Sequence, residues 1–425
     1  MELAFRSDQG QLPRNEDCLL ALENQELFIV CDGLSVKKGG EQAAQLAAET
    51  FQEWAVANQS LLAAARGPSA TNENRRVLAE SLQVAFSTAS KNIFQRAASE
   101  PDFHGMCTGA DVLLMLGSHA LVGHVGAGRV YLVRKGEAHL LTEDHTQLAY
   151  LRRLGKLAEA SPQQITSYSR RVTKAVGFQE EVQPDTLLVE LEPGDRFLLM
   201  TDGIWQSLGD GTCFSLAARP GAAKDLVEAL HSTVNETGSR DNFTSIVVDP
   251  KLAATPAVGG NSAELKVKML GRVPVFEYLA YQDLLKVLSV GDLVKVGPGQ
   301  VLCKEGDPGG EMMLVLSGSA NVVKNGKVIR VLGKGEVFGE MSMLDAAPRS
   351  ASVVASVGTN LLAFPRDALF LLFREDPSLS VKFLWGVTME MNRRLRMASN
   401  QLVGRPEQEG VQAPKNETLP FHRSL

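Results

Sequence analysis

Two apolar runs of this chain stop abruptly at an Asp-Gly pair. Phe28 to Ser35 reads FIVCDGLS, and Phe197 to Trp205 reads FLLMTDGIW. A short apolar run that ends at a turn signal predicts a buried strand, and glycine lets the backbone turn freely after it. We therefore expect Asp32 and Asp202 to lie where buried strands end.

The first 250 residues alternate short apolar runs with two long helical patterns. The runs are LFIV, DVLLML, ALVGHV, RVYLVR, AHLLT, RFLLM and TSIVV, and the helical patterns are EQAAQLAAETFQEWAVA and ENRRVLAESLQVAFSTASKNIFQRA. The segments GSH and RKGE between neighbouring runs indicate hairpin turns. Hairpin strands with long helices between their groups predict an α+β fold in which helices cover antiparallel sheets.

The second half of the chain has a different composition and a different spacing of apolar runs. Residues 251–264 are rich in Ala, Pro, Gly and small polar residues, which predicts a flexible linker. Residues 265–402 then carry closely spaced glycines and brief runs such as MMLVLSG and KVIRVLG, which predict a small β-barrel or jelly roll followed by a helix. Residues 403–425 are expected to be disordered.

Composition excludes several classes of protein. A net charge of −6 gives no electrostatic footprint for nucleic acid. No apolar stretch approaches the ~20 residues that span a membrane, and MELAFRSDQG lacks the pattern of a signal peptide. The five cysteines are scattered and are expected to be reduced thiols. These features predict a cytoplasmic protein without nucleic acid or membrane partners.

Five carboxylates are expected at strand ends in the first half of the chain. Glu16 and Asp17 precede the first apolar run, Asp241 precedes TSIVV, and Asp32 and Asp202 end their runs. One Asp-Gly alone usually marks only a turn, but carboxylates gathered at one edge would repel one another unless a cation neutralised them. Oxygen ligands without a Cys or His cluster favour Mg²⁺ or Mn²⁺, and two such ions can bind a phosphate ester and generate a metal-bound hydroxide.

The segments RNED, CDG followed by GGEQAA, TDGIW and RDNFTSIVV occur in this order. As a set they resemble the metal-dependent serine/threonine protein phosphatases of type 2C, over about residues 1–250. The resemblance implies an α-β-β-α sandwich and, as nucleophile, a water that bridges two Mn²⁺ or Mg²⁺ ions. It also implies a role for each acidic residue. Asp32 would bridge both metals, the Glu16 carboxylate and the Gly33 carbonyl would serve one metal, Asp202 and Asp241 would serve the other, and Asp17 would hold metal-bound water.

The chain departs from this family at two places near the substrate. The family has an Arg three residues before the Asn of NED, where this chain has Leu12, and Arg14 lies two residues later. Arg14 could still bind the substrate phosphate as a bidentate donor. After Asp32-Gly33 the chain reads Leu34-Ser35-Val36 instead of Met-Gly-Gly or His-Gly-Gly, so no general-acid His follows there.

A third departure concerns a third metal ion. The family commonly reads GDSR where this chain has GAGR, so Ala127 replaces the Asp that holds this weaker metal. One hypothesis is that Asp111, about opposite Ala127 across the hairpin at roughly 5 Å, supplies the lost carboxylate from the neighbouring strand. The alternative is that Asp111 is an unrelated polar substitution and that the third site is gone. Both remain open from the sequence.

A second candidate site lies in FGEMSMLDAAPRSASVV, which begins at Phe338. The guanidinium of Arg349 suits a phosphate, and Glu340 can accept a hydrogen bond from a ribose hydroxyl. A short helix beginning at Met341 would direct backbone N–H groups at the same phosphate. On these residues alone, a loop with a surface Glu340 and a solvated Arg349 is the better interpretation.

The spacing of FGE, eight residues and PRSA is similar to the phosphate-binding cassette of cyclic nucleotide-binding domains, and the match extends over about residues 268–400. It implies that Glu340 binds the ribose 2′-hydroxyl and Arg349 the cyclic phosphate. Further contacts would come from Phe338, Gly339, Met341, Ser350 and Ala351. In that family, Thr at the position of Ser350 is associated with guanine and Ala with adenine, so cAMP is favoured only weakly over cGMP. The helix after Asp376 would cap the base and could contact a second chain in a homodimer.

These features together predict a cytoplasmic, Mn²⁺- or Mg²⁺-dependent phosphatase that acts on phosphoserine and phosphothreonine in a phosphoprotein substrate and is regulated by a cyclic nucleotide. The alternative is a pseudophosphatase that acts as a cyclic-nucleotide-dependent binding protein. Ala127, Val36 and the displaced Arg14 favour the alternative. Five retained and mutually repelling carboxylates favour the enzyme.

Overall fold

The computed structural model describes residues 1–35, 38–67, 69–157, 160–252, 262–340 and 348–402. These residues form two compact units, one before residue 253 and one after residue 261. Most of the expected linker, the whole expected tail at 403–425, and Met341 lie outside the described residues. None of the helices in the described part of the chain combines the length and the apolar character needed to span a bilayer.

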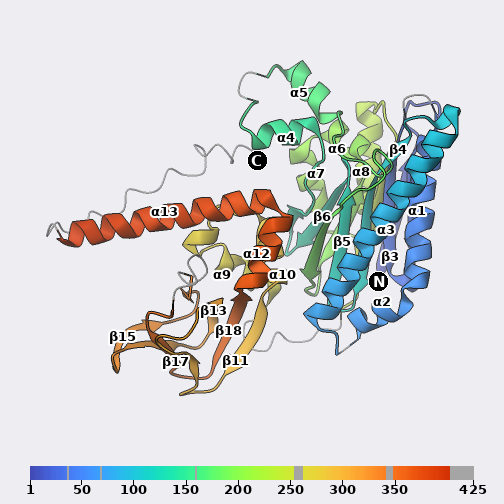
Figure 1. Ribbon diagram of the computed structural model, residues 1–425. Helices are drawn as coiled ribbons and strands as arrows, with labels where there is room; N and C mark the ends of the chain where they lie inside the picture. The colour runs from blue at the N-terminus through green and yellow to red at the C-terminus, as the bar shows by residue number, and fades with distance from the viewer. Residues whose placement is uncertain (36–37, 68, 158–159, 253–261, 341–347, 403–425) are drawn as a thin grey trace. The chain divides into compact units, whose positions relative to one another are not determined.

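The first unit contains two antiparallel sheets of five strands each (Figure 1). One sheet has the strand order β1-β10-β9-β6-β7, and the other has the order β2-β3-β4-β5-β8. The strands of the first sheet are β1 (Glu2–Asp8), β6 (Arg129–Arg134), β7 (Glu137–Leu140), β9 (Arg196–Met200) and β10 (Phe243–Asp249). Those of the second are β2 (Cys18–Leu22), β3 (Leu27–Leu34), β4 (Cys107–Leu116), β5 (His119–Val125) and β8 (Asp185–Glu190).

Helices cover the outer face of each sheet. The helices of this unit, not all of which lie on a sheet, are α1 (Gly40–Ala57), α2 (Gln59–Arg66), α3 (Asn72–Ser99), α4 (Gln147–Arg153), α5 (Pro162–Ser169), α6 (Asp202–Leu208), α7 (Asp210–Ala217) and α8 (Ala223–Thr237), with 3₁₀ turns η1 (Glu23–Gln25) and η2 (Pro101–Phe103). Helices α1 and α3 pack on the sheet that contains β3 and β4, whereas α6 to α8 pack on the sheet that contains β10 (Figure 1). These four layers confirm the α-β-β-α sandwich.

Strand alternation decides which side chains enter each layer. Ile29 and Cys31 of β3 pack with Phe51 of α1 and Phe86 of α3 in the outer core. Successive residues of a strand point to opposite faces, so Asp32 faces the other sheet. The space between the two sheets therefore receives the first of the predicted carboxylates.

One predicted hairpin shows why the sequence signal works. In the turn between β6 and β7, Lys135 has φ = 52° and Gly136 has φ = 81°. Two successive residues with positive φ form the turn type whose twist matches that of the flanking strands. The RKGE hairpin is therefore confirmed.

The second unit is a barrel of two antiparallel four-stranded sheets, with strand orders β11-β18-β13-β16 and β12-β17-β14-β15. Its strands are β11 (Asp292–Val296), β12 (Val301–Cys303), β13 (Glu311–Ser317), β14 (Ala320–Lys324), β15 (Lys327–Leu332), β16 (Val337–Phe338), β17 (Ser352–Ala355) and β18 (Thr359–Pro365). The sheets enclose an apolar core that includes Met313, Val315 and Leu361. The flanking helices are α9 (Ala263–Leu270), η3 (Pro274–Phe276), α10 (Tyr281–Ser289), α12 (Arg366–Glu375) and α13 (Pro377–Leu402). The predicted jelly roll with flanking helices is confirmed.

Candidate functional site

The five predicted carboxylates come from both sheets of the first unit. Asp32 lies in β3, and Asp202 is the first residue of α6, separated from the end of β9 by Thr201 alone. Glu16 and Asp17 precede β2, and Asp241 precedes β10. The negative charges of Asp202, Asp17 and Asp241 all raise the pKa of Asp32, so these residues lie close together. The fold therefore gathers the carboxylates that the sequence places far apart.

Close backbone packing explains the glycine of both Asp-Gly pairs. A Cβ on Gly33 would lie 2.3 Å from the carbonyl oxygen of Gly40 and 2.4 Å from that of Glu16. A Cβ on Gly203 would lie 2.0 Å from the carbonyl oxygen of Asn242. No side chain fits at these distances, so glycine lets the segments that carry the other acidic residues reach Asp32 and Asp202.

Asp17 is held by two hydroxyl groups that the sequence analysis missed. Its Oδ2 accepts hydrogen bonds from Thr201 Oγ1 at 3.0 Å and from Thr244 Oγ1 at 2.7 Å. Burial raises the pKa of Asp17 to about 7, the two hydroxyls oppose the rise, and the charges of Asp241 and Glu16 add to it. The sequence indicated these two threonines only by their positions near the acidic residues, since Thr201 immediately precedes Asp202 and Thr244 follows Asp241 by three residues.

Asp32 and Asp202 share a hydrogen bond between their carboxyl groups. Burial, followed by the charges of neighbouring carboxylates, raises the pKa of Asp32 well above its usual range and that of Asp202 to about 7. Gln206, one helical turn after Asp202, donates from Nε2 to its Oδ2 at 2.6 Å. Two acidic groups this close cannot both be charged at low cost without a cation.

Asn242 fixes the loop that carries Glu16. Its Oδ1 accepts from the Glu16 backbone N–H at 2.8 Å, and its Nδ2 donates to the carbonyl oxygens of Gln9 at 2.7 Å and Arg14 at 2.9 Å. Burial raises the pKa of both Glu16 and Asp241. Asn242 is itself buried, so it positions the acidic loop rather than meeting solvent.

Arg14 lies exposed in the loop between β1 and β2. Its charge lowers the pKa of Glu16, against the larger effect of burial, so its guanidinium lies near the acidic cluster. This position suits the predicted contact with a substrate phosphate, which stays a prediction.

The donor set of this cluster suits divalent cations. All five carboxylates have raised pKa values, with burial as the largest cause in each. Among the described residues, no three such side chains already stand in a ready metal-binding arrangement. Crowded carboxylate oxygens without Cys or His fit Mg²⁺ or Mn²⁺, because a hard cation would relieve their repulsion.

The predicted register of Asp111 is wrong. Asp111 pairs with His124 of β5 and with Val30 of β3, while β5 ends at Val125, before Ala127. The hairpin turn lies at Gly117 and Ser118, closer to Asp111 than expected, and the residue paired with Asp111 is three positions before Ala127. Asp111 still lies beside the segment of Ala127 and Gly128 that follows β5, because a Cβ on Gly128 would fall 1.9 Å from its Oδ2.

Asp111 belongs to a buried polar network. Its Oδ1 lies 2.7 Å from His124 Nδ1, and His124 Nε2 lies 3.0 Å from the carbonyl oxygen of Glu143. Burial raises the pKa of Asp111, and the His124 ring opposes the rise. A role for Asp111 in holding a third metal stays a prediction.

The second unit brings the FGE segment and the PRSA segment into contact. Gly339 has φ = 83°, and a Cβ on it would lie 2.3 Å from Arg349 Nη1. Arg349 is buried, and its Nη2 donates to the carbonyl oxygen of Glu311 at 2.8 Å. Its backbone N–H donates to the carbonyl oxygen of Asp307 at 2.8 Å. Arg349 is thus set in the barrel wall against the glycine turn, not solvated in a loop.

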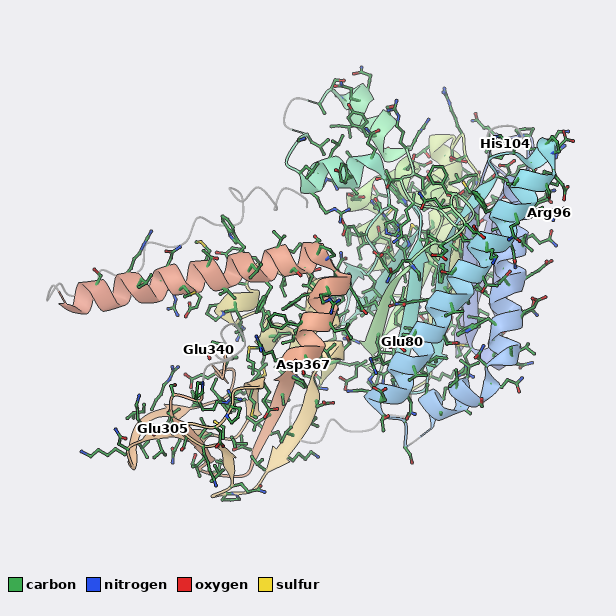
Figure 2. All side chains as sticks on the ribbon, viewed as in Figure 1. Glu80, Arg96, His104, Glu305, Glu340 and Asp367 are labelled. Carbon is green, nitrogen blue, oxygen red and sulfur yellow. The ribbon has the colours of Figure 1, made fainter. Side chains whose placement is uncertain are left out.

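The other predicted nucleotide contacts surround this turn. Phe338 is buried in β16, and Glu340 follows at the edge of the barrel (Figure 2). Ser350 is exposed beside Arg349, and the carbonyl oxygen of Ala351 lies 3.9 Å from Cys303 Sγ. Met341 and its expected helix lie outside the described residues.

Two family models match the chain. Residues 8–247, more than half of its length, match the model described as protein phosphatase 2C. Residues 293–376 match the model described as cyclic nucleotide-binding domain.

Similar proteins cover the first unit. The chain is 29% identical over 256 residues to protein phosphatase PhpP of Streptococcus pneumoniae serotype 2 (strain D39 / NCTC 7466), covering 58% of this chain and 97% of PhpP. It is 27% identical over 258 residues to serine/threonine phosphatase stp of Listeria monocytogenes serovar 1/2a (strain ATCC BAA-679 / EGD-e), covering 59% of this chain and 97% of stp. A solved structure described as a bacterial serine phosphatase has a TM-score of 0.52 at 22% identity, covering 60% of this chain and 100% of its own. This last likeness concerns the fold.

Proposed function

Because the chain belongs to the protein phosphatase 2C family and also carries a cyclic nucleotide-binding domain, we propose that it removes phosphate from phosphoserine and phosphothreonine in proteins under the control of a cyclic nucleotide. The observation that supports the catalytic part most is the gathering of five carboxylates whose pKa values all rise. If the site bound no cation, the repulsion among these carboxylates would be left without compensation.

The ions we assign to the cluster are two of Mn²⁺ or Mg²⁺. The groups that would hold them are the carboxylates of Glu16, Asp32, Asp202 and Asp241 and the carbonyl of Gly33, with Asp17 behind them. When bound, such ions supply positive charge to the phosphoryl group and acidify a water molecule.

The side chains of the protein bind and orient around that chemistry. Arg14 would hold the substrate phosphate through its guanidinium, whose fork suits two phosphate oxygens. The hydroxyls of Thr201 and Thr244 fix the Asp17 carboxylate, and the Gln206 amide fixes Asp202. Rigid orientation of ligands by such neighbours keeps a metal site in its productive geometry.

The regulatory part rests on the second unit. We assign the cyclic phosphate to Arg349 and the ribose 2′-hydroxyl to Glu340. The preference for cAMP over cGMP is weak, because Ser350 is neither the Thr associated with guanine nor the Ala associated with adenine. The contact between Gly339 and Arg349 supports this assignment. Regulation requires that the nucleotide bind two catalytic states with different affinity.

The expected location is the cytoplasm. All five cysteines are free, which agrees with a reducing compartment.

The test is hydrolysis of a phosphothreonine peptide by the full chain in Mn²⁺, with and without cAMP, beside Asp202→Ala. We expect turnover by the wild type, its loss in the variant and a change with cAMP. Absence of turnover in every condition would instead favour a nucleotide-binding pseudophosphatase.

A further inference from the structure

A pocket of about 230 Å³ opens at the rim of the acidic cluster. It is lined by Asp241, by Gly203 and Gln206 of α6, and by residues of the α8–β10 connection. Gln206 also holds Asp202, so the pocket adjoins the candidate catalytic carboxylates. A group bound in it would lie beside the reacting end of a substrate.

Two arginines from separate segments line this pocket. Arg170 directly follows α5, and Arg240 lies between α8 and β10. Both are exposed, and no carboxylate in the described part of the chain lies within ion-pairing distance of either guanidinium. Arg170 is still near enough for its charge to lower the pKa of Asp241, against the larger effect of burial. The pocket thus combines two cations with one carboxylate.

The side-chain hydroxyl groups of the lining already donate within the protein. Ser207 Oγ donates to the Gly203 carbonyl oxygen at 2.7 Å, and Thr237 Oγ1 donates to that of Val234 at 2.7 Å. One N–H of the Gln206 amide donates to Asp202. Besides the second N–H of the Gln206 amide, the side-chain donors left for a ligand are those of the two guanidiniums, so the pocket suits an anion with several acceptor oxygens rather than a neutral polar group.

We propose that this pocket is an anion subsite that recognises a carboxylate or a second phosphoryl group on the substrate, close in sequence to the phosphate that is removed. The proposal rests on the proposed phosphatase function and adds the class of phosphoprotein segment that the enzyme prefers. Arg240 and Arg170 provide the recognition, since an acidic side chain there gains charge-assisted hydrogen bonds that an uncharged one lacks.

The experiment compares three phosphothreonine peptides of one sequence in Mn²⁺. Their neighbouring positions carry alanine, glutamate, or the non-hydrolysable phosphoserine mimic phosphonomethylalanine. We expect kcat/KM to be about three- to tenfold higher for the anionic peptides than for the alanine peptide, which is the range of the net contribution of one hydrogen bond. The better of the two anionic peptides identifies the source of the anion.

The variants are Arg240→Gln and Arg170→Gln, with Arg219→Gln as the matched control. Arg219 is an exposed arginine after α7 and does not line the pocket. Each pocket variant should lose most of the preference through a higher KM and should hydrolyse p-nitrophenyl phosphate like the wild type, because that probe has no neighbouring anion. The control should keep the preference.

Two results would overturn the inference. One is equal kcat/KM of the wild type for all three peptides. The other is an equal loss of p-nitrophenyl phosphate and peptide turnover in the pocket variants, which would place the arginines on the reacting phosphate.

Failure of the proposed function would be recognised separately. If the wild type did not hydrolyse p-nitrophenyl phosphate, the phosphatase assignment would fall, and the subsite would be measured by fluorescence anisotropy of the labelled peptides. The wild type must then bind the anionic peptides more tightly than the alanine peptide, and Arg240→Gln must remove the difference; any other result rejects the subsite.

Discussion

At the residue scale, each carboxylate of the cluster depends on partners far away in sequence. Asp17 accepts from Thr244, which is 227 residues distant, and the Glu16 N–H donates to Asn242, which is 226 residues distant. The motifs identify the acidic residues. The hydroxyl and amide groups that hold them belong to common residue types, and nothing in the sequence indicates which contacts they make. Only the folded chain identifies them.

His145 leads to a prediction on pH. Its Nδ1 accepts from the Gly126 N–H at 3.0 Å, and its Nε2 lies 3.3 Å from Asp185 Oδ2. This pattern suits the neutral ring, and burial lowers the pKa of His145 to about 4. The folded state then binds fewer protons than the unfolded state below about pH 6.5, so stability falls as pH falls from there toward 4.

We therefore expect His145→Asn to flatten this acid-side loss by on the order of 2 kcal/mol between pH 6.5 and 4.5. The free energy of unfolding would be measured in urea at both pH values. The exposed His104, at the end of the helical layer in Figure 2, supplies the control His104→Asn, which should keep the wild-type slope. Equal slopes for wild type and His145→Asn would contradict the assignment of a neutral ring.

At the element scale, the inner strands were readable from sequence and most outer strands were not. The apolar runs predicted β3 to β7, β9 and β10, whereas β1, β2 and β8 were missed. All three missed strands lie at an edge of their sheet. An edge strand pairs on one side only and carries a weaker apolar pattern, so its place is decided by the partner strand.

The two Asp-Gly pairs that begin α6 and α7 provide a matched prediction. Gly203→Ala should lower the free energy of unfolding by about 1–3 kcal/mol and reduce activity, because its Cβ would meet the Asn242 carbonyl oxygen and displace the Asp241 segment. Gly211→Ala has open space around the new Cβ and should raise stability by about 1 kcal/mol through helix propensity. Thermal unfolding and phosphopeptide turnover of both variants check this; equal effects would show that the close approach at Gly203 is unimportant.

The exposed face of α13 predicts self-association through a second copy of this chain. Val381, Leu384, Thr388, Met391 and Leu395 recur at alternating spacings of three and four residues. The four apolar members are 48%, 55%, 55% and 67% exposed. This is the repeat by which two like helices form a coiled coil.

We expect the full chain to sediment as a dimer and the double variant Leu384→Glu, Met391→Glu to sediment as a monomer. Val84→Glu, at an exposed apolar position on α3, is the control and should remain dimeric. A monomeric wild type at about 100 µM would remove the basis for the homodimer.

At the scale of the whole molecule, the two units have separate cores and separate candidate ligands. A ligand that binds only the folded state stabilises it by about 2.7 kcal/mol at 100 times its Kd. We therefore expect two unfolding transitions of the full chain in calorimetry, with Mn²⁺ raising the midpoint of one and cAMP that of the other. Arg349→Gln should abolish the cAMP shift alone, while Arg330→Gln, at an exposed ion pair with Glu336, should preserve it.

If Arg349→Gln kept the full cAMP shift, the nucleotide would have to bind elsewhere. A shift of both transitions by cAMP would show that the two units are coupled, which is the property that regulation requires.

The sequence by itself determined the family that each half of the chain resembles. Short apolar runs, long helical patterns and Asp-Gly at strand exits are local features, and they indicated both fold classes and the acidic site. The spacing from Glu340 to Arg349 indicated the second site only through its resemblance to cyclic nucleotide-binding domains. The tertiary structure alone decided that Asp111 faces His124, that Thr201 and Thr244 hold Asp17, and that Arg170 and Arg240 share one pocket. These facts depend on strand register and on contacts between distant segments, and a shift of a few residues in either would change them without altering any local pattern.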